Sequence, residues 1–189
     1  MQRAVFLDRD GTIIEDVGYL SDICQIRILP GAAEAIRLLK HNGFKVIIVT
    51  NQAGVAKGYF SEEKLQEINT RLLETMSEQG AHVDKIYYCP HHTEGTVEEY
   101  KKECSWRKPN PGMIEAAARE YDLDITNSFM IGDKSSDIEA GRRAGCRTIL
   151  LTGQGQTDTG NKFSEADHIA AGLYDAVKLL LTIENQLIQ

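Results

Sequence analysis

The sequence has few cysteines, no long hydrophobic run and no excess of positive charge. No apolar run approaches the roughly 20 residues that a membrane-spanning helix needs. The first residues lead at once into a short apolar segment and two acids, which is unlike a signal peptide. Four cysteines without a secretory signal favour reduced thiols or a metal site over disulfides. We therefore expect a cytoplasmic protein with no membrane partner.

Positive charge is outnumbered, with 21 Lys and Arg against 28 Asp and Glu and a formal net charge of −7. Nucleic-acid binders usually carry a basic face, so we expect no nucleic-acid partner. The balance does not exclude a small anionic substrate, because local cations are available. The candidates are Arg9, Lys57, Arg107, Lys108 and Lys134.

The length and composition are those of one globular domain spanning residues 1–189, with 42% hydrophobic and 26% charged residues. Short apolar strands alternate with amphipathic helices, which predicts a doubly wound, Rossmann-like parallel sheet covered on both faces. A glycine-rich segment, residues 152–160, lacks the Gly-Lys-Ser/Thr of a P-loop and is predicted to be a mobile surface loop. The expected strands are residues 4–7, 45–49, 85–88, 129–131 and 148–151, and the expected helices are residues 30–43, 61–80, 135–145 and 172–185, with another starting at 110–111.

The first expected strand ends in two acids, Asp8 and Asp10, followed by Gly11. Ligands of open α/β sheets bind beyond the carboxyl ends of the strands. Two acids there can divide covalent catalysis, one attacking and the other moving protons, or they can hold a hard cation. The pattern also fits a simple turn, because Asp and Gly favour turns. The segment is not a calcium-binding loop of the EF-hand type. Such a loop needs Glu at its twelfth position, which counted from Asp8 is Tyr19.

Polar residues also follow the second and fourth expected strands and the long loop after the third. Each alone fits a turn or a solvated charge, but parallel strands bring their carboxyl ends to one edge of the sheet. The joint pattern therefore favours a single site over several unrelated turns. The residues are Thr50, Asn51, Gln52, Arg107, Lys108, Asp133, Lys134 and Asp137.

In this order the residues resemble the four motifs of the haloacid dehalogenase (HAD) superfamily of phosphotransferases, and the likeness extends to about residue 151. Further segments are similar to the heptose-bisphosphate phosphatases and to the related histidinol-phosphatases. The resemblance implies a HAD-like fold, and the gaps between motifs leave no room for a separate cap domain. The motifs are Asp8-Arg-Asp10-Gly-Thr12, Thr50-Asn51-Gln52-Ala-Gly54, Tyr88-Cys89-Pro-His91-His92, Arg107-Lys108-Pro-Asn-Pro-Gly112-Met113 and Gly132-Asp133-Lys134-Ser-Ser-Asp137.

The resemblance also implies roles for individual residues. Asp8 would be the nucleophile that forms an aspartyl-phosphate, and Asp10 the general acid and base. Mg²⁺ would be held by the carboxylates of Asp8 and Asp133 and by the backbone carbonyl of Asp10. Substrate contacts are implied for Thr50, Asn51 and Lys108 at the phosphoryl group and for Gln52, Arg107 and Lys134 farther along the substrate.

The function implied by the resemblance is a Mg²⁺-dependent phosphomonoesterase that removes the 7-phosphate of D-glycero-D-manno-heptose 1,7-bisphosphate. Histidinol-phosphatase is the alternative, in which Glu15 and Asp16 at the entrance would receive the substrate's amine. The acidic balance disfavours a nucleic-acid 3′-phosphatase, and the intact acid pair disfavours a non-catalytic phosphate binder. No exposed apolar stripe demands a partner, so we expect a monomer.

The loop over residues 89–106 resembles a structural zinc loop, Cys-x-His followed by Cys-x-Cys. It supplies Cys89, His91 and Cys104, but the fourth position holds Trp106, which cannot bind zinc. Structural zinc is almost always four-coordinate. Two outcomes stay open: three ligands hold Zn²⁺ weakly, completed by water or His92, or the ion is lost and Trp106 packs the loop.

Overall fold

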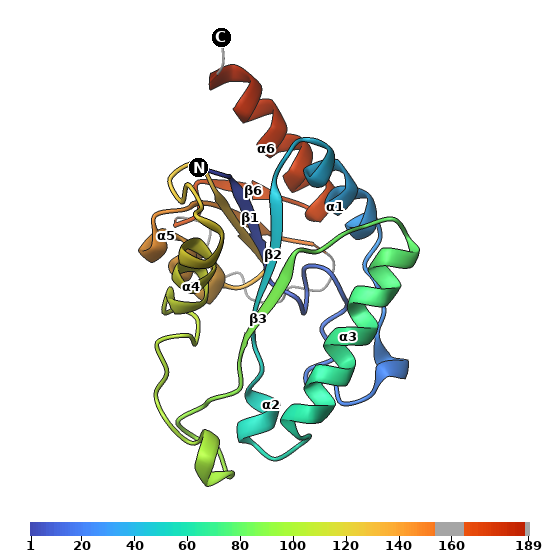
Figure 1. Cartoon of the computed structure of the whole chain (residues 1–189), viewed down its shortest axis with the longest axis vertical. Coiled ribbons are helices and arrows are strands. Elements are labelled where there is room, and N and C mark those ends of the chain that lie inside the picture. The colour runs from blue at the N-terminus through green and yellow to red at the C-terminus, as the bar shows by residue number, and fades with distance from the viewer. Residues whose placement is uncertain (154–164, 188–189) are drawn as a thin grey trace.

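The structure is a computed structural model that describes residues 1–153 and 165–187. A six-stranded parallel sheet lies at its centre, with the strand order β3-β2-β1-β4-β5-β6 (Figure 1). The segment predicted to be a mobile loop lies outside the described residues from position 154 onward. The strands are β1 (Ala4–Leu7), β2 (Lys45–Asn51), β3 (Lys85–Cys89), β4 (Phe129–Gly132), β5 (Arg147–Leu151) and β6 (His168–Ala170).

Helices pack on both faces of the sheet, and alternate strand residues feed two separate hydrophobic cores. Val5 and Leu7 of β1 point into one core, which α1 (Ala32–His41), α3 (Glu62–Glu78) and α6 (Leu173–Leu187) cover. Ala4 and Phe6 point into the other, which α4 (Gly112–Tyr121) and α5 (Ser135–Ala144) cover (Figure 1). A strand with both faces buried explains why β1 is a continuous apolar run. The predicted doubly wound α/β fold is confirmed.

Four short elements escaped the prediction from sequence. They are β6, the helix α2 (Ala53–Ala56) and two 3₁₀ helices, Ile23–Gln25 and Glu98–Tyr100. β6 has only three residues and leaves Ile169 exposed at the sheet edge, so no apolar run announces it. The four-residue α2 is too short to show helical periodicity.

The parallel arrangement brings the ends of β1, β2 and β4 to one edge of the sheet. Leu7 pairs in register with Ile48 of β2 and with Ile131 of β4. The chain then continues into Asp8, whose backbone N–H donates to the carbonyl of Ile131 at 3.1 Å. Every strand that carries a predicted site residue therefore delivers it to the same edge.

Gly11 allows the loop after β1 to approach the end of β4. Its φ of +86° lies in the left-handed region, and a Cβ there would lie 2.3 Å from Oδ2 of Asp133. Only glycine meets both conditions without a clash. The turn after the acid pair is thus shaped by the neighbouring carboxylate of Asp133.

No separate cap domain occurs within the described residues. The chain between Asp10 and Thr50 contains one 3₁₀ helix, α1 and most of β2, and the chain between Thr50 and Lys108 contains α2, α3, β3 and the second 3₁₀ helix. All of these elements belong to the sheet, its covering helices or the loops at its edge. None of the described helices combines the length and apolarity needed to cross a membrane.

Candidate active site

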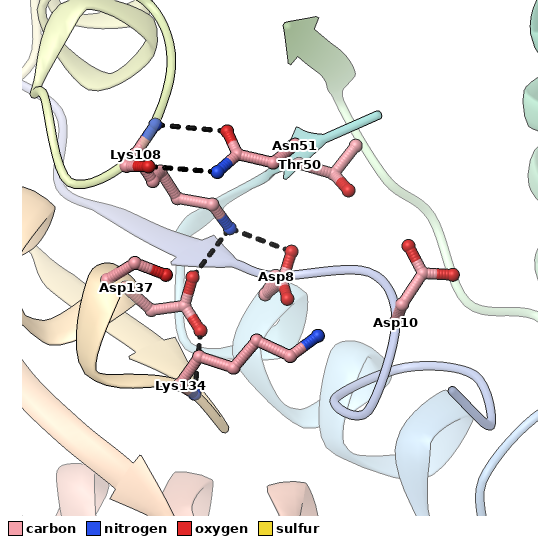
Figure 2. A pocket seen from close by; sticks show the side chains of 8 residues that line it. Asp8, Asp10, Thr50, Asn51, Lys108, Lys134 and Asp137 are labelled. Atoms are coloured by element: carbon pink, nitrogen blue, oxygen red, sulfur yellow. Dashed lines mark hydrogen bonds and ion pairs between the residues drawn. The ribbon is translucent and has the colours of Figure 1, made fainter. Parts of the chain in front are cut away.

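A cavity opens at the carboxyl edge of the sheet, where the loops after β1, β2 and β4 meet the loop before α4. Figure 2 shows acidic, basic and polar side chains from these four segments, with Lys108 reaching between Asp8 and Asp137. The sequence predicted that these strand ends would share one site. The lining residues are Asp8, Asp10, Thr50, Asn51, Lys108, Lys134, Ser136 and Asp137.

Lys108 lies at the centre of this arrangement and is buried, with 4% of its surface exposed. Its Nζ lies 2.8 Å from Oδ1 of Asp8 and 2.7 Å from Oδ1 of Asp137, and it donates to the carbonyl of Val49 at 2.7 Å (Figure 2). Burial alone would lower the pKa of Lys108, but the two facing carboxylates raise it above its ordinary value. The ammonium group therefore stays charged and links three separate segments.

Asn51 fixes the backbone that carries Lys108. Its Nδ2 donates to the carbonyl of Lys108 at 2.9 Å, and its Oδ1 accepts from the backbone N–H of Lys108 at 3.0 Å. Both polar ends of the amide are thus engaged with one residue. This arrangement favours a positioning role for Asn51 over direct contact with a substrate.

Asp8, Asp133 and Asp137 form a carboxylate cluster, in which one oxygen from each residue lies within 4.8 Å of the others. Burial, with the negative charges of Asp8 and Asp137, raises the pKa of Asp133 to about 7. Hard divalent cations prefer carboxylate and carbonyl oxygen ligands. The oxygen donors, their mutual repulsion and the close approach of Gly11 to Asp133 fit a bound Mg²⁺ at Asp8 and Asp133.

Asp10 does not join this cluster through its side chain. In Figure 2 its carboxylate points away from Lys108 and Asp137, toward the far side of the cavity. The carboxylate oxygens accept from the guanidinium of Arg9 at 3.1 Å, and Oδ2 also accepts from Nε2 of Gln52 at 2.9 Å. The side chain of Asp10 is thus engaged elsewhere, which is compatible with the expectation that Asp10 would contact Mg²⁺ through its backbone carbonyl.

The other predicted substrate contacts are distributed around the cavity. Thr50 is buried in its wall, and its hydroxyl accepts from Nε2 of Gln52 at 2.9 Å. Gln52 itself is buried and does not line the cavity. Nζ of Lys134 lies 2.8 Å from the carboxylate of Asp16.

Lys134 lines the cavity, whereas Arg107 lies beside it. Burial alone would lower the pKa of Lys134, but the hydrogen bond to Asp16 and the charges of Asp133 and Asp8 raise it. Arg107 donates to the carbonyl of His91 at 3.2 Å and is not among the residues lining the cavity. The structure thus places Lys134 in the site and Arg107 beside it, against the loop over residues 89–106.

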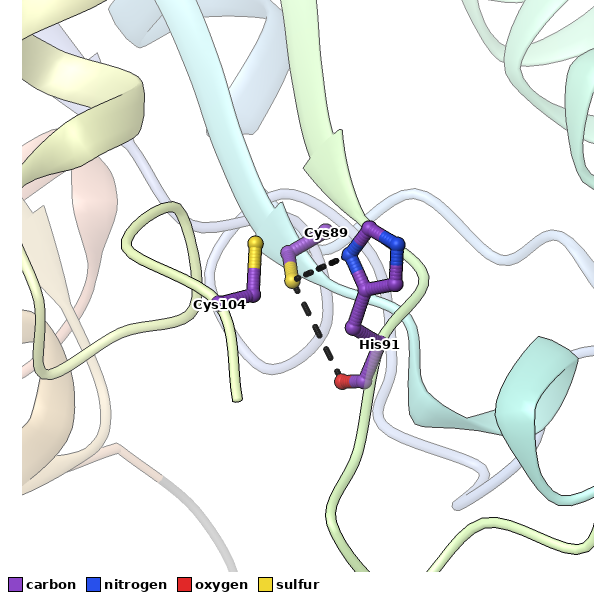
Figure 3. Close-up of side chains that lie close together, drawn as sticks. All are labelled: Cys89, His91 and Cys104. Atoms are coloured by element: carbon purple, nitrogen blue, oxygen red, sulfur yellow. Dashed lines mark hydrogen bonds between the residues drawn. The ribbon is translucent and has the colours of Figure 1, made fainter. Parts of the chain in front are cut away.

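A second cluster lies in that loop, behind Arg107. Figure 3 shows Cys89, His91 and Cys104 pointing toward one another, with Sγ of Cys89 3.8 Å from Nδ1 of His91. Trp106 instead turns its ring edge-on to Tyr87, with ring centroids 5.8 Å apart. The three predicted zinc ligands are therefore brought together, and the residue at the fourth position packs against β3.

Two further residues of the site, Asn69 and Ser136, were not predicted, and Arg9 has partners that the sequence did not indicate. The sequence offers Arg9 only as a cation for phosphate, yet it is buried against Asp10. Asn69 accepts from Arg9 and stands on the buried face of α3, where a polar residue among Leu65, Ile68 and Leu72 was a usable signal. Ser136 lines the cavity, and no sequence pattern distinguished it.

Comparison with known proteins finds two matching family profiles. Residues 5–83 match the family described as haloacid dehalogenase-like hydrolase, and residues 105–176 match one described as HAD-hydrolase-like. These two matches include the acid pair and the segment from Lys108 to Asp137.

Full-length relatives are also found. The chain is 40% identical over 180 residues to a D-glycero-beta-D-manno-heptose-1,7-bisphosphate 7-phosphatase of Pasteurella multocida, covering 95% of this chain and 97% of that protein. It is 41% identical over 181 residues to the Photorhabdus laumondii protein of the same name, covering 96% of each. Among solved structures, the D,D-heptose 1.7-bisphosphate phosphatase from B. bronchiseptica, complexed with magnesium and phosphate, superimposes with a TM-score of 0.80 at 29% identity, covering 95% of this chain and 98% of that chain.

The carboxylate cluster predicts that Mg²⁺ stabilises the protein more at about pH 8 than at about pH 6. The pKa of Asp133, about 7 against an ordinary 3.8, makes its ionisation unfavourable in the metal-free fold. The stability that this carboxyl contributes in its protonated form is present in full below the unfolded pKa and is lost as the pH rises through about 7. Mg²⁺ binds the ionised form and reverses the loss. The measurement is the rise in Tm on adding MgCl₂ at the two pH values.

The matched control is Asp133→Asn, which removes the buried charge and keeps the side-chain shape. The metal-free variant should melt higher than the parent at about pH 8, and Mg²⁺ should no longer raise its Tm. Equal Mg²⁺ shifts at the two pH values in the parent, or an undiminished shift in the variant, would contradict the assignment.

Proposed function

The chain belongs to the haloacid dehalogenase-like hydrolases and, within them, to the family of the heptose-bisphosphate phosphatases, and on that premise we propose that it removes the 7-phosphate of D-glycero-D-manno-heptose 1,7-bisphosphate. The observation that carries this proposal is the convergence of Asp8, Lys108 and the carboxylate of Asp133 beside Asp10 at one sheet edge. It supplies a nucleophile, a phosphate-binding cation and a site for Mg²⁺ at a single edge of the sheet.

In the first step, a carboxylate oxygen of Asp8 attacks phosphorus and forms a P–O bond. The bond between phosphorus and the sugar oxygen breaks, and that oxygen takes a proton from the carboxyl group of Asp10. The two acids have different partners, because Lys108 faces Asp8 while Arg9 and Gln52 face Asp10. The leaving sugar is thus released as a neutral alcohol.

In the second step, a water molecule attacks the phosphorus of the aspartyl-phosphate. Asp10, now ionised, takes the proton of this water, the bond between phosphorus and Asp8 breaks, and phosphate leaves. Asp8 returns as a carboxylate and Asp10 as a carboxylic acid. One residue therefore acts first as the acid and then as the base.

Residues around the acids hold the phosphoryl group during both steps. Lys108 and Thr50 face the cavity beside Asp8, and Lys134 contributes a second positive charge. Fixed cations and donors of this kind provide most of what phosphoryl transfer requires. Mg²⁺, held by Asp8, Asp133 and the backbone carbonyl of Asp10, would offset repulsion between the anionic nucleophile and the anionic substrate.

Histidinol-phosphatase is the second enzymatic candidate, and the structure gives it no added support. That substrate carries an amine, for which Glu15 and Asp16 were the predicted partners. Asp16 already forms an ion pair with Lys134. Burial alone would raise the pKa of Asp16, but the hydrogen bonds from Lys134 and from the backbone of Gly18, together with nearby positive charge, hold it below the ordinary value. A second cation at this carboxylate would have to displace Lys134.

The proposed function predicts Mg²⁺-dependent phosphate release from heptose 1,7-bisphosphate in preference to histidinol phosphate and a 3′-phosphorylated oligonucleotide. Asp8→Asn should lower turnover by roughly 10³-fold or more while leaving Tm close to that of the parent, because the nucleophile is lost. The assay measures kcat/KM for the three substrates with and without chelator. Preference for histidinol phosphate would select the alternative, and near-normal activity of the variant would rule out covalent catalysis by Asp8.

We also propose the cluster of Cys89, His91 and Cys104 as a weak zinc site. The support is the mutual approach of three donors of the kind zinc prefers. Trp106 packs against Tyr87, and water would complete the tetrahedron. A site with one exchangeable ligand holds zinc less firmly than a closed four-ligand site.

Trp106→Cys tests this site by restoring a fourth thiolate. After dialysis against a mild chelator, the variant should retain about one equivalent of zinc, and the parent should lose most of its metal. Elemental analysis of both proteins gives the result. Full retention by the parent would show that its site is already closed, and absence of zinc from both proteins would show that the cluster binds none.

We further propose that the protein is a cytoplasmic monomer. All four cysteines are free thiols, which suits a reducing compartment. Among the large exposed apolar side chains of the described residues, Tyr19 and Tyr59 contact each other, with ring centroids 4.4 Å apart, while Met1, Trp106 and Ile169 lie on other segments. Exposed apolar side chains of this number are normal for a monomer.

A further inference from the structure

Arg9, which stands between the two catalytic acids, has a side chain that is only 1% exposed. Arginine is almost never buried without partners, because desolvating its charge is costly. Arg9 is among the largest fully buried side chains of the described residues. The guanidinium of Arg9 must therefore have partners that compensate for its burial beside Asp10.

The partners of Arg9 are Asp10 and one residue of a distant helix. Nε donates to Oδ2 of Asp10 and NH2 to Oδ1, both at 3.1 Å, so the guanidinium grips the two carboxylate oxygens as a fork. NH1 donates to Oδ1 of Asn69 at 2.9 Å. Asn69 is itself buried on α3, so Arg9 is anchored to a helix that contributes no residue to the cavity lining.

Gln52 completes the enclosure of the Asp10 carboxylate. Its Nε2 donates to Oδ2 of Asp10 and to the hydroxyl of Thr50, both at 2.9 Å. Asp10 is therefore held from two sides, by Arg9 and by Gln52, and neither partner is the Lys108 that holds Asp8. Two acids only two positions apart in the chain are thus kept on separate sets of hydrogen-bond donors.

We infer that Arg9, anchored by Asn69, is a positioning residue that fixes the orientation of Asp10 for proton transfer to and from the reacting oxygens. The inference rests on the proposed function. No separate cap domain occurs among the described residues, so side chains of the site itself have to orient this acid. The bidentate fork is specific to arginine, because lysine offers a point charge and cannot grip both oxygens.

The test compares two substrates that need a proton donor to different degrees. p-Nitrophenyl phosphate releases a stable phenolate and needs little general-acid help, while a sugar phosphate releases a basic alkoxide and needs a great deal. The ratio kcat/KM depends on the steps up to formation of the aspartyl-phosphate. Of the two roles of Asp10, it therefore reports the role as acid and not the later role as base. A lost fork should therefore change the preference between the two substrates.

In Arg9→Lys, kcat/KM for heptose 1,7-bisphosphate should fall about tenfold or more beyond any fall for p-nitrophenyl phosphate, since positioned acids contribute about 10²- to 10⁴-fold. Inhibition by inorganic phosphate should change by less than about twofold, because Lys108 and Thr50 still bind the phosphoryl group. A parallel loss on both substrates, or no loss on either, would overturn the inference.

Two further variants separate positioning from folding. Asn69→Ala keeps Arg9 but removes its anchor, so it should shift the substrate preference in the same direction by a smaller factor, and it decides the question if Arg9→Lys fails to fold. Arg147→Lys is the matched control, because Arg147 pairs with Glu184 at the opposite end of the strands and should leave the preference unchanged. An unchanged preference in a folded Asn69→Ala would also count against the inference.

The outcome also distinguishes this inference from the proposed function. If the parent protein hydrolyses neither substrate with Mg²⁺ present, the proposed function fails. If the parent hydrolyses both and the Arg9 variant loses both in parallel, only the positioning role of Arg9 fails.

Discussion

The buried ammonium group of Lys108 is the interaction on which the rest of the site depends. It lies within 2.8 Å of a carboxylate oxygen of Asp8 and of Asp137, and all three residues are buried. Buried carboxylates without a partner would repel one another and favour protonation or rearrangement. A single cation bridging two of them allows β1, the loop before α4 and the start of α5 to converge. The reciprocal hydrogen bonds of Asn51 then fix the backbone from which this cation extends.

The two acids of the first motif, Asp8 and Asp10, are each held by a different cation. Lys108 holds Asp8 at the phosphoryl side, and Arg9 with Gln52 holds Asp10 at the leaving-group side. Burial, with the negative charges of Asp8 and Asp137, raises the pKa of Asp133 to about 7, and the same cluster of carboxylate oxygens fits a divalent cation. The charges of the site therefore affect both the free energy of unfolding and the arrangement of the catalytic acids.

The sequence predicted the sheet, its principal strands and the convergence of their ends, because apolar runs and alternation depend only on which faces are buried. It also predicted the cluster of Cys89, His91 and Cys104, whose donors do meet. It did not reveal the partners of Arg9 or Asn51, because the direction of a side chain in a loop depends on elements brought close only by folding. Asn69 was recoverable in principle, as a polar residue on the buried stripe of α3, whereas the three-residue β6 left no pattern to read.

A double-mutant cycle between Lys108 and Asp137 tests the central interaction most directly. Lys108→Met should lower the free energy of unfolding by about 3–5 kcal/mol at neutral pH, because it leaves buried carboxylates without their cation. Adding Asp137→Asn should recover much of that loss, so that the two changes are strongly non-additive by urea unfolding. Additive losses, or a Lys108→Met variant as stable as the parent, would show that this ion pair does not hold the site together.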